Sequence, residues 1–406
     1  MPVDPGRAIA DLRELDRRTG GPDSGARRVA WTPEWEAARA LLRERVDEIG
    51  GVQIETDEAG NLWARLQGER GETVAVGSHL DSVPGGGWLD GALGVMAGLE
   101  VLRASAEAAI PARSVALVDF ADEEGARFGR SLFGSSAVAG TLDPEAVASL
   151  EDAEGRTLRD VLADYGVELA TATNAENRLD GLVAYLELHI EQGPVLEREG
   201  VPVAAVSGTA GLERRRLGFT GQASHAGTTP MDMRRDAGLA AASAALAVEA
   251  IARELGGVGT TGVLRLEPGI PTAVAGRAEL LVDLRHGEAG PLAQMLSAAQ
   301  AAARRAADER GCELDDEEVW RIEPIPFDER LVAAALDAAG SGRTLPSGAL
   351  HDAAEMARRV PAAMMFTSSM AGISHAREED TPEPHLEQAI AAFGQLAGRV
   401  IAGEVV

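Results

Sequence analysis

A glycine-rich loop between an apolar strand and an apolar helix is the feature that most constrains this chain. Residues 73–77 form a short apolar run that ends in glycine, which is typical of a buried strand. Residues 92–102 are apolar almost throughout, as expected of a helix packed against a sheet. His79, Asp81 and Asp90 lie between the two runs. Open α/β sheets hold their ligands beyond the carboxyl ends of the strands, so a histidine and two carboxylates here indicate the beginning of a metal site.

The charge balance of the chain excludes several classes of function. The 406 residues carry a formal net charge of −27, which argues against nucleic acid or an anionic membrane as a partner. All 38 basic residues are arginine. The absence of lysine excludes Schiff-base chemistry, attachment of pyridoxal phosphate and the lysine of a P-loop.

Cysteine usage and the apolar runs give further limits. Cys312 is the only cysteine, so neither an intrachain disulfide nor a thiolate-rich zinc site can form. The first residues lack the apolar core of a signal peptide, and no apolar run is long enough to span a bilayer. We therefore expect a soluble cytoplasmic protein.

Candidate polar residues also follow the other apolar strands of the predicted sheet. Residues 114–120 form a strand that leads to Glu123 and Glu124, and residues 182–190 contain His189 near their end. A further strand leads to His375. The alternation of strands and helices predicts a layered α/β domain. For the two glutamates, the alternative is a loop exposed to solvent.

The pattern changes between residues 211 and 324. Residues 231–255 and 291–310 predict helices, and residues 262–266 and 277–285 predict strands between them. With one strand before and one after these elements, the order strand, helix, strand, strand, helix, strand is the ferredoxin-like pattern. We therefore predict an inserted α+β domain over residues 211–324 and an α/β domain formed by residues 1–210 and 325–406.

Five candidate ligands fall at strand or loop ends of the α/β domain: His79, Asp90, Glu124, His189 and His375. Three imidazoles and two carboxylates, one of them shared, suit a pair of zinc, manganese or similar ions that activate one water. Asp81 could accept the second N–H of the His79 ring and so fix its tautomer. Glu123 would then be the general base.

An ordered set of motifs carries a family resemblance over essentially the whole chain. They are Gly77-Ser-His-Leu-Asp81, Gly86-Gly87 before Asp90-Gly91, Glu123-Glu-Gly-Ala-Arg-Phe-Gly129, Leu186-Glu-Leu-His-Ile-Glu-Gln-Gly-Pro194, Ser224-His-Ala-Gly-Thr-Thr-Pro-Met231 and Gly372-Ile-Ser-His375. Each is weak alone. Together they resemble the hydantoinase/carbamoylase-type amidases of the M20 metallopeptidase clan, which include N-carbamoyl-L-amino acid hydrolases, β-ureidopropionases and allantoate amidohydrolases.

The resemblance implies a catalytic domain with two metal ions and an inserted dimerisation (lid) domain. Asp90 would bridge two divalent ions, which could be zinc, manganese, cobalt or nickel. His79 and His189 would complete one site, and Glu124 and His375 the other. Glu123 would deprotonate the water and later protonate the leaving nitrogen. The resemblance also implies a homodimer.

The resemblance assigns substrate contacts as well. His225, from the insertion, would stabilise the oxyanion, in its own or the partner's site. Gln192, His351 and Arg285 match substrate contacts, and Arg285 suits a carboxylate. Thr272 stands where the family has a substrate-binding asparagine. Two further departures are Ala275 in place of a proline and Leu350 in place of a glycine.

The most direct expectation is a hydrolase of a non-peptide C–N bond, namely the ureido group of a small N-carbamoyl-L-amino acid, releasing ammonia and carbon dioxide. An alternative, favoured by Thr272, is allantoate or another amidino or acyl substrate. A non-catalytic binding protein on the same fold is a remote third reading, since such proteins usually lose a ligand or the base.

Overall fold

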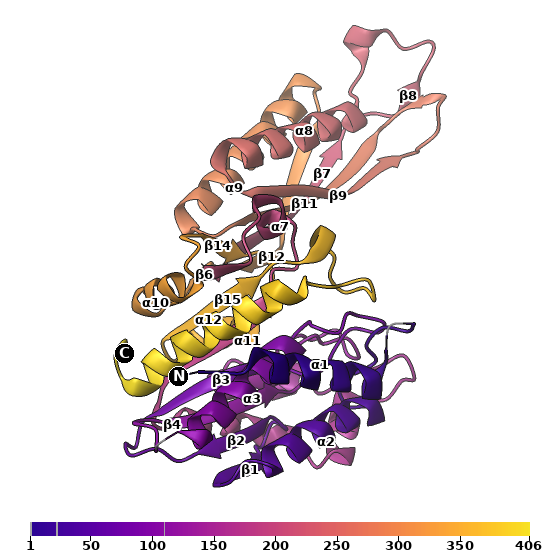
Figure 1. The fold of residues 1–406 in the computed structure, drawn as a ribbon. Coiled ribbons are helices and arrows are strands. Elements are labelled where there is room, and N and C mark those ends of the chain that lie inside the picture. Colours follow the sequence, from indigo (N-terminus) through magenta and orange to yellow (C-terminus); the bar gives the residue numbers. More distant parts are fainter. Residues whose placement is uncertain (1, 22, 109) are drawn as a thin grey trace. The chain divides into compact units, whose positions relative to one another are not determined.

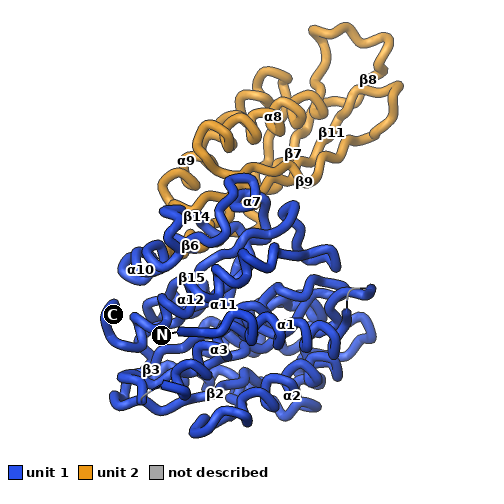
Figure 2. Tube along the Cα trace, viewed as in Figure 1, with its two compact units in different colours: residues 1–208, 327–406 blue, residues 209–326 orange. Residues whose placement is uncertain are grey.

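The computed structural model describes residues 2–21, 23–108 and 110–406. The chain divides into two compact units, one formed by residues 1–208 and 327–406 and the other by residues 209–326 (Figure 2). We refer to them as unit 1 and unit 2. The insertion predicted over residues 211–324 lies within unit 2, and its role as a lid or dimerisation domain stays a prediction.

Unit 1 is built around a mixed sheet whose strands run in the order β1-β2-β4-β3-β5-β15-β6, with β14 beside β6 (Figure 1). Their bounds are β1 (Val52–Thr56), β2 (Leu62–Leu66), β3 (Thr73–His79), β4 (Ser114–Phe120), β5 (Leu182–Ile190), β6 (Val203–Thr209), β14 (Thr344–Ser347) and β15 (Ala362–Thr367). The central strands β4, β3, β5 and β15 are mutually parallel, so their carboxyl ends meet at one edge of the sheet. The predicted α/β fold is confirmed.

Helices cover both faces of this sheet. Their bounds are α1 (Pro5–Thr19), α2 (Pro33–Asp47), α3 (Ala92–Glu107), α4 (Phe133–Ala139), α5 (Pro144–Val147), α6 (Leu158–Asp164), η1 (Leu169–Leu179), α7 (Val195–Glu199), α10 (Glu329–Ala339), α11 (Asp352–Met356), η3 (Met370–Gly372) and α12 (Glu383–Ala402). Successive residues of a strand point to opposite faces. Accordingly, Val74 and Val76 of β3 join the core beneath α1, α3 and α12, whereas Ala75 joins the core beneath α4 and η1.

The start of α2 follows from local sequence. Thr32 has extended backbone angles, and its Oγ1 accepts the N–H of Trp35 at 3.4 Å. Pro33 occupies the first helical position, where a missing N–H costs nothing.

Unit 2 contains an antiparallel sheet in the order β12-β7-β11-β9 and a small β8–β10 pair. Its elements are β7 (Gly211–Thr220), β8 (Ser224–His225), η2 (Met231–Met233), α8 (Ala237–Leu255), β9 (Val258–Glu267), β10 (Ala273–Val274), β11 (Arg277–His286), α9 (Ala289–Glu309), β12 (Glu313–Ile322) and β13 (Ile325–Pro326). Helices α8 and α9 share one core with β7 and β11. The strand-helix-strand-strand-helix-strand order is that of the ferredoxin-like pattern.

Two boundaries in unit 2 illustrate where the structure differs from the sequence-based prediction. The helix predicted over 231–255 begins at Ala237, because Asp236 caps it by accepting the N–H of Leu239 at 3.1 Å, and residues 231–233 form a separate turn. The strand predicted over 262–266 extends to Val258–Glu267 along its pairing with β11. In unit 1, residues 344–347 form β14, whose proline is tolerated because this strand pairs only with β6 among the described strands.

Among the helices of the described residues, none combines the length and the apolar character that a membrane span requires.

Candidate metal centre and active site

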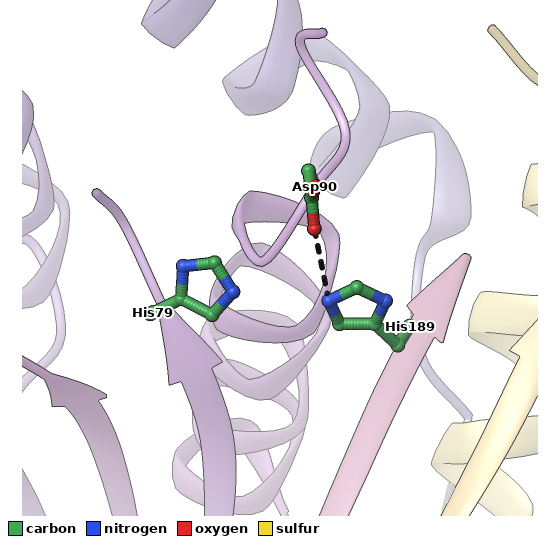
Figure 3. Close-up of side chains that lie close together, drawn as sticks. All are labelled: His79, Asp90 and His189. Atoms are coloured by element: carbon green, nitrogen blue, oxygen red, sulfur yellow. Dashed lines mark ion pairs between the residues drawn. The ribbon is translucent and has the colours of Figure 1, made fainter. Parts of the chain in front are cut away.

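The first cluster of candidate ligands forms where two neighbouring parallel strands end. His79 is the last residue of β3, and His189 lies one residue before the end of β5. Asp90 reaches them from the loop that precedes α3, and its Oδ1 lies 3.1 Å from Nε2 of His189 (Figure 3). One ligand atom from each of the three residues lies within 4.8 Å of the others, and all three side chains are buried. The prediction that these residues come together agrees with this geometry.

Gly91 makes this close approach possible. Its φ is 63°, in the left-handed region that favours glycine. A Cβ at this position would lie 2.3 Å from Cε1 of His79. A side chain on the residue after Asp90 would therefore fill the space between the loop and the imidazole.

The second cluster shares Asp90 with the first. Its other oxygen, Oδ2, lies 3.3 Å from Nε2 of His375, and that nitrogen lies 3.5 Å from Oε2 of Glu124. Asp90, Glu124 and His375 also hold one ligand atom each within 4.8 Å of the others. Oε1 of Glu124 is buried and has no hydrogen-bond partner within the described structure, which is costly for a carboxylate unless a cation is bound. Asp90 thus stands between two three-ligand clusters.

The pKa values of the first cluster reflect its crowding. Burial would raise the pKa of Asp90, but hydrogen bonds with His189 and His375 lower it well below the usual value. Burial would lower the pKa of His79, yet the negative charges of Glu123 and Asp81 raise it well above its usual value. The cluster therefore binds positive charge, as protons or as a cation, at neutral pH.

The second cluster shows the same tendency. Burial, followed by the charge of Asp90, raises the pKa of Glu124 to about 7. The hydrogen bond with Asp90 raises the pKa of His375 to about 9.

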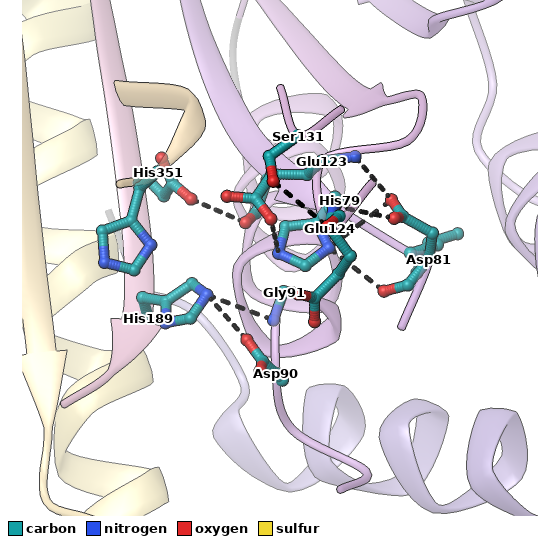
Figure 4. Close-up of polar contacts among 12 residues, drawn as sticks. His79, Asp81, Asp90, Gly91, Glu123, Glu124, Ser131, His189 and His351 are labelled. Atoms are coloured by element: carbon teal, nitrogen blue, oxygen red, sulfur yellow. Dashed lines mark hydrogen bonds and ion pairs between the residues drawn. The ribbon is translucent and has the colours of Figure 1, made fainter. Parts of the chain in front are cut away.

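Glu123 lies beside the first cluster, with Oε2 3.7 Å from Nε2 of His79 (Figure 4). Burial raises the pKa of Glu123 well above its usual value, although the charge of His79 opposes this. A buried glutamate with a raised pKa next to candidate metal ligands is suited to take up and release a proton.

Asp81 acts differently from the prediction. Nδ1 of His79 hydrogen-bonds with the main-chain oxygen of Asp81 at 3.1 Å, and the carboxylate is farther away, at 3.6 Å. The carboxylate instead accepts the main-chain N–H groups of Glu123 and Glu124, each at 3.1 Å (Figure 4). The carbonyl orients His79, and the carboxylate holds the loop that carries both glutamates.

Two of the predicted substrate contacts lie at this site. Nε2 of Gln192 donates to Asp90 Oδ2 at 3.1 Å and to Ser374 Oγ at 3.2 Å. Gln192 has a φ of 58°, and such strain in a residue other than glycine is typical of functional positions. His351 is buried, with its ring centroid 4.4 Å from that of His189. Burial, followed by the charge of His189, lowers the pKa of His351 well below its usual value, so it is neutral.

The remaining predicted residues belong to unit 2. Nδ1 of His225 in β8 accepts the N–H groups of Gly227 and Thr228. Arg285 in β11 donates from Nε to Asp283 Oδ1 at 2.8 Å. Thr272 precedes β10, and its carbonyl accepts the N–H of Ala226. Thr272 and His225 therefore lie on neighbouring loops of unit 2.

Comparison with known proteins decides the family. Residues 75–399 match the model of Peptidase family M20/M25/M40. The chain belongs to this family.

Relatives narrow the assignment within the M20 family. The chain is 39% identical over 376 residues to an N-carbamoyl-L-amino acid amidohydrolase of Geobacillus stearothermophilus, covering 91% of each chain. It is 33% identical over 403 residues to an allantoate amidohydrolase of Bacillus subtilis, covering 96% of each. The crystal structure of a hydantoinase/carbamoylase family amidase from Burkholderia multivorans matches with a TM-score of 0.87 and 32% identity, covering 99% of this chain and 98% of that one. The predicted assignment to the amidohydrolases of the M20 family is confirmed.

The donor set of this M20 protein fits divalent metal ions. Imidazole suits zinc, copper, iron and nickel, whereas carboxylate suits magnesium, calcium and manganese, and carboxylates also ligate zinc. The two clusters and the buried unpaired oxygen of Glu124 form a donor set that divalent cations would satisfy.

Sequence reasoning missed three buried carboxylates around this M20 site. Glu187 accepts the hydroxyl of Ser78 at 2.7 Å and the N–H of Ala353 at 2.9 Å, and it forms a further candidate cluster with His189 and His351. Burial, followed by the charge of Glu187, raises the pKa of Asp352 well above its usual value. Burial, followed by the charge of Asp90, raises the pKa of Glu379 to about 7. Glu187 lies inside the motif of residues 186–194, and Asp352 directly follows His351, so closeness in sequence to predicted site residues was the available signal.

Proposed function

We propose that the protein is a metal-dependent amidohydrolase that cleaves the ureido group of an N-carbamoyl-L-amino acid. The reaction consumes water and releases the amino acid, ammonia and carbon dioxide. The observation that carries this proposal is Asp90, whose two oxygens face two different ligand clusters with Glu123 beside them. The amidohydrolases among the relatives support the reaction class.

The site would hold two divalent ions, with Asp90 between them. His79 and His189 would complete one site, and Glu124 and His375 the other. Zinc is one candidate, and manganese, cobalt and nickel are others, since the same donors serve all of them. Two such ions lower the pKa of a water and polarise a carbonyl oxygen.

Proton transfer falls to Glu123. Its carboxylate accepts a proton from the attacking water and delivers it to the leaving nitrogen, so the residue ends the cycle in its starting state. Burial raises the pKa of Glu123, which favours its holding the proton between the two steps. Asp81 fixes the main chain of Glu123 and Glu124, which keeps the proton-transfer group and a metal ligand in register.

Substrate binding would use residues from both units. Gln192 and His351 would contact the substrate from unit 1. His225 would stabilise the developing oxyanion, and the guanidinium of Arg285 would bind the substrate carboxylate, which suits its planar pair of donors.

Allantoate is the second candidate substrate. Thr272 replaces the asparagine amide that the family resemblance places beside the substrate carboxylate, so recognition of that carboxylate is weakened or redirected. The similarity to the allantoate amidohydrolase of Bacillus subtilis, which covers 96% of both chains, supports this candidate.

A homodimer formed through unit 2 is part of the proposal. Leu239 and Leu246 of α8 and Leu264 and Leu266 of β9 expose 41–71% of their surface. β9 is an edge strand, whose main-chain groups are free to pair with another strand. A second copy would cover this apolar edge.

A cytoplasmic location stays a prediction.

The test is ammonia release by the metal-reconstituted protein against several N-carbamoyl-L-amino acids, N-carbamoyl-β-alanine and allantoate. Release of free amino acid from the matching N-acyl compounds is measured in parallel. We expect one ureido class to be turned over, and Glu123→Gln to lower that rate by about 10²–10⁴-fold with the metal content unchanged. Undiminished turnover in Glu123→Gln would refute the mechanism. No turnover of any panel compound by protein with two bound ions would refute the proposed substrate class.

A further inference from the structure

We propose that Glu379 is a positioning residue that ties the loop of Asp90 to the loop of His375 and thereby sets the geometry of the second metal site. This inference rests on the proposed function, because it concerns the ions that the site would hold. Neither the motifs nor the metal clusters assign a role to Glu379.

One oxygen of Glu379 holds the loop that carries Asp90. Oε1 accepts the main-chain N–H of Asp90 at 3.0 Å and that of Leu89 at 3.3 Å. Asp90 is the residue whose carboxylate is shared by the two clusters, and Leu89 directly precedes it. The contact acts on the main chain of Asp90 and leaves both of its side-chain oxygens facing the clusters.

The other oxygen of Glu379 holds the loop that carries His375. Oε2 accepts the hydroxyl of Ser374 at 2.9 Å. The same hydroxyl lies 3.4 Å from Oδ2 of Asp90, the oxygen that faces His375. Glu379 therefore fixes both partners of the 3.3 Å approach between Asp90 and His375.

Burial makes this connection stiff. Glu379 is 1% exposed, and a Cβ on Gly87 would lie 2.1 Å from its Oε1, so its carboxylate is packed against the main chain of the Asp90 loop. A buried carboxylate is stable only when its oxygens are paired, so the three hydrogen bonds are costly to break. Burial lowers the pKa of the Arg28 guanidinium, and the negative charge of Glu379 is among those that oppose this shift, so the two buried side chains attract each other.

The neighbouring residue strengthens the same junction. Oδ1 of Asp380 accepts Nε1–H of Trp88 at 3.1 Å. Glu379 and Asp380 thus join residues 88–90 to residues 374–381 from two directions. The side chain of Glu378, by contrast, is exposed and pairs with Arg377, which makes it a matched control.

The consequence is specific to the second ion. His79 and His189 are held by strands β3 and β5, and Glu124 is held by Asp81. His375 lies on a loop, is about half exposed and has a φ of 56°. The distance between His375 and Asp90 depends on Glu379 and Ser374. Losing the Glu379 carboxylate should therefore weaken binding of the second ion far more than binding of the first.

The test is titration of the metal-free protein with zinc against a chromophoric chelator, for the wild type and for Glu379→Ala, Glu379→Gln and Glu378→Ala. In Glu379→Ala we expect the Kd of the second equivalent to rise about 10–100-fold, with the first changed less than about threefold. Glutamine should restore binding, because its amide oxygen can accept the Asp90 N–H and its NH2 can donate to Ser374. Glu378→Ala should match the wild type.

Turnover gives a second readout. We expect Glu379→Ala to lower kcat with KM nearly unchanged at saturating zinc, and Glu379→Gln to recover most of kcat. Ser374→Ala removes only one of the three hydrogen bonds, so it should raise the Kd of the second equivalent by a smaller factor. This variant keeps the test decisive if Glu379→Ala does not fold.

Two results would overturn the positioning role. One is wild-type affinity for both ions in Glu379→Ala. The other is an equal loss of affinity for both ions in Glu379→Ala, with no recovery of affinity in Glu379→Gln, which would indicate a general structural role. If the wild type itself binds fewer than two ions, the proposed function fails first, and this role fails with it.

Discussion

Asp90 faces His189 with one carboxylate oxygen, Oδ1, at 3.1 Å from Nε2, and keeps the other oxygen for a different histidine. A carboxylate so placed belongs to two ligand clusters at once. Four predictions follow from this arrangement and from the packing that supports it, in addition to that for Glu123.

Asp90→Asn should remove the shared ligand. An amide offers one oxygen and one NH2 group that cannot ligate a cation, so we expect the bound metal to fall to one ion per chain or fewer. Turnover should fall by at least about 10²-fold, comparable to the loss of one group that stabilises the transition state. Elemental analysis of the dialysed protein and a rate assay measure the two effects. The exposed Asp23→Asn serves as the control, and two retained ions in Asp90→Asn would rule out the bridge.

His225→Ala should separate catalysis from metal binding. His225 lies in unit 2 and in neither ligand cluster, so the metal content should stay the same. If it stabilises the oxyanion, kcat should fall by about 10²–10³-fold. His286→Ala, in the same unit, is the matched control. A drop in metal content, or an unchanged kcat, would contradict the assignment.

Chelation should destabilise the protein. Ions that bind only the folded state stabilise it by about 2.7 kcal/mol per site when the free metal is 100 times Kd. We expect the melting temperature of unit 1 to fall by several degrees on addition of a chelator and to recover with zinc. The Asp90→Asn variant, which we expect to keep one ion or fewer, should show at most about half of this shift. A similar shift in both proteins would show that the chelator acts elsewhere.

Arg39→Met should destabilise unit 1. Nε of Arg39 lies 2.7 Å from Oδ2 of Asp119, and both side chains are buried. The other oxygen of Asp119 accepts the N–H of Leu80, the residue between His79 and Asp81. Removing the cation leaves a buried unpaired carboxylate, so we expect a loss of about 3–5 kcal/mol in the free energy of unfolding.

Urea denaturation followed by tryptophan fluorescence measures this loss. Arg43→Met, on the same helix, is the control, because the side chain of Arg43 is 37% exposed and lies 3.7 Å from Glu36. It should change stability by less than about 1 kcal/mol. Equal effects of the two substitutions would mean that the Arg39–Asp119 pair contributes no more than a surface pair.

Most of the fold and the grouping of the candidate ligands could be predicted from sequence, because their signals are local. An apolar run that ends in glycine marks β3, and the residue that follows such a run must lie at the edge of the sheet. This placed His79, Glu124 and His189 at one edge before any contact was known. The alternation of strands and helices likewise separated unit 2 from unit 1.

Contacts between distant segments could not be predicted in this way. The carboxylate of Asp81 was expected on His79, but it holds the Glu123–Glu124 loop. The start of α8 was placed too early, because the apolar pattern continues through residues where Asp236 caps the helix.

The sequence by itself determined the strands, the edge at which the chemistry lies, and the family. Only the tertiary structure decided which oxygen of Asp90 faces which histidine, and that Glu379 holds the Asp90 loop across 289 residues of chain. The physical reason is that the hydrophobic periodicity of a strand or helix depends on residues that are close in sequence. The hydrogen bonds of a buried carboxylate, by contrast, depend on donors that are distant in sequence and meet it only in the folded chain.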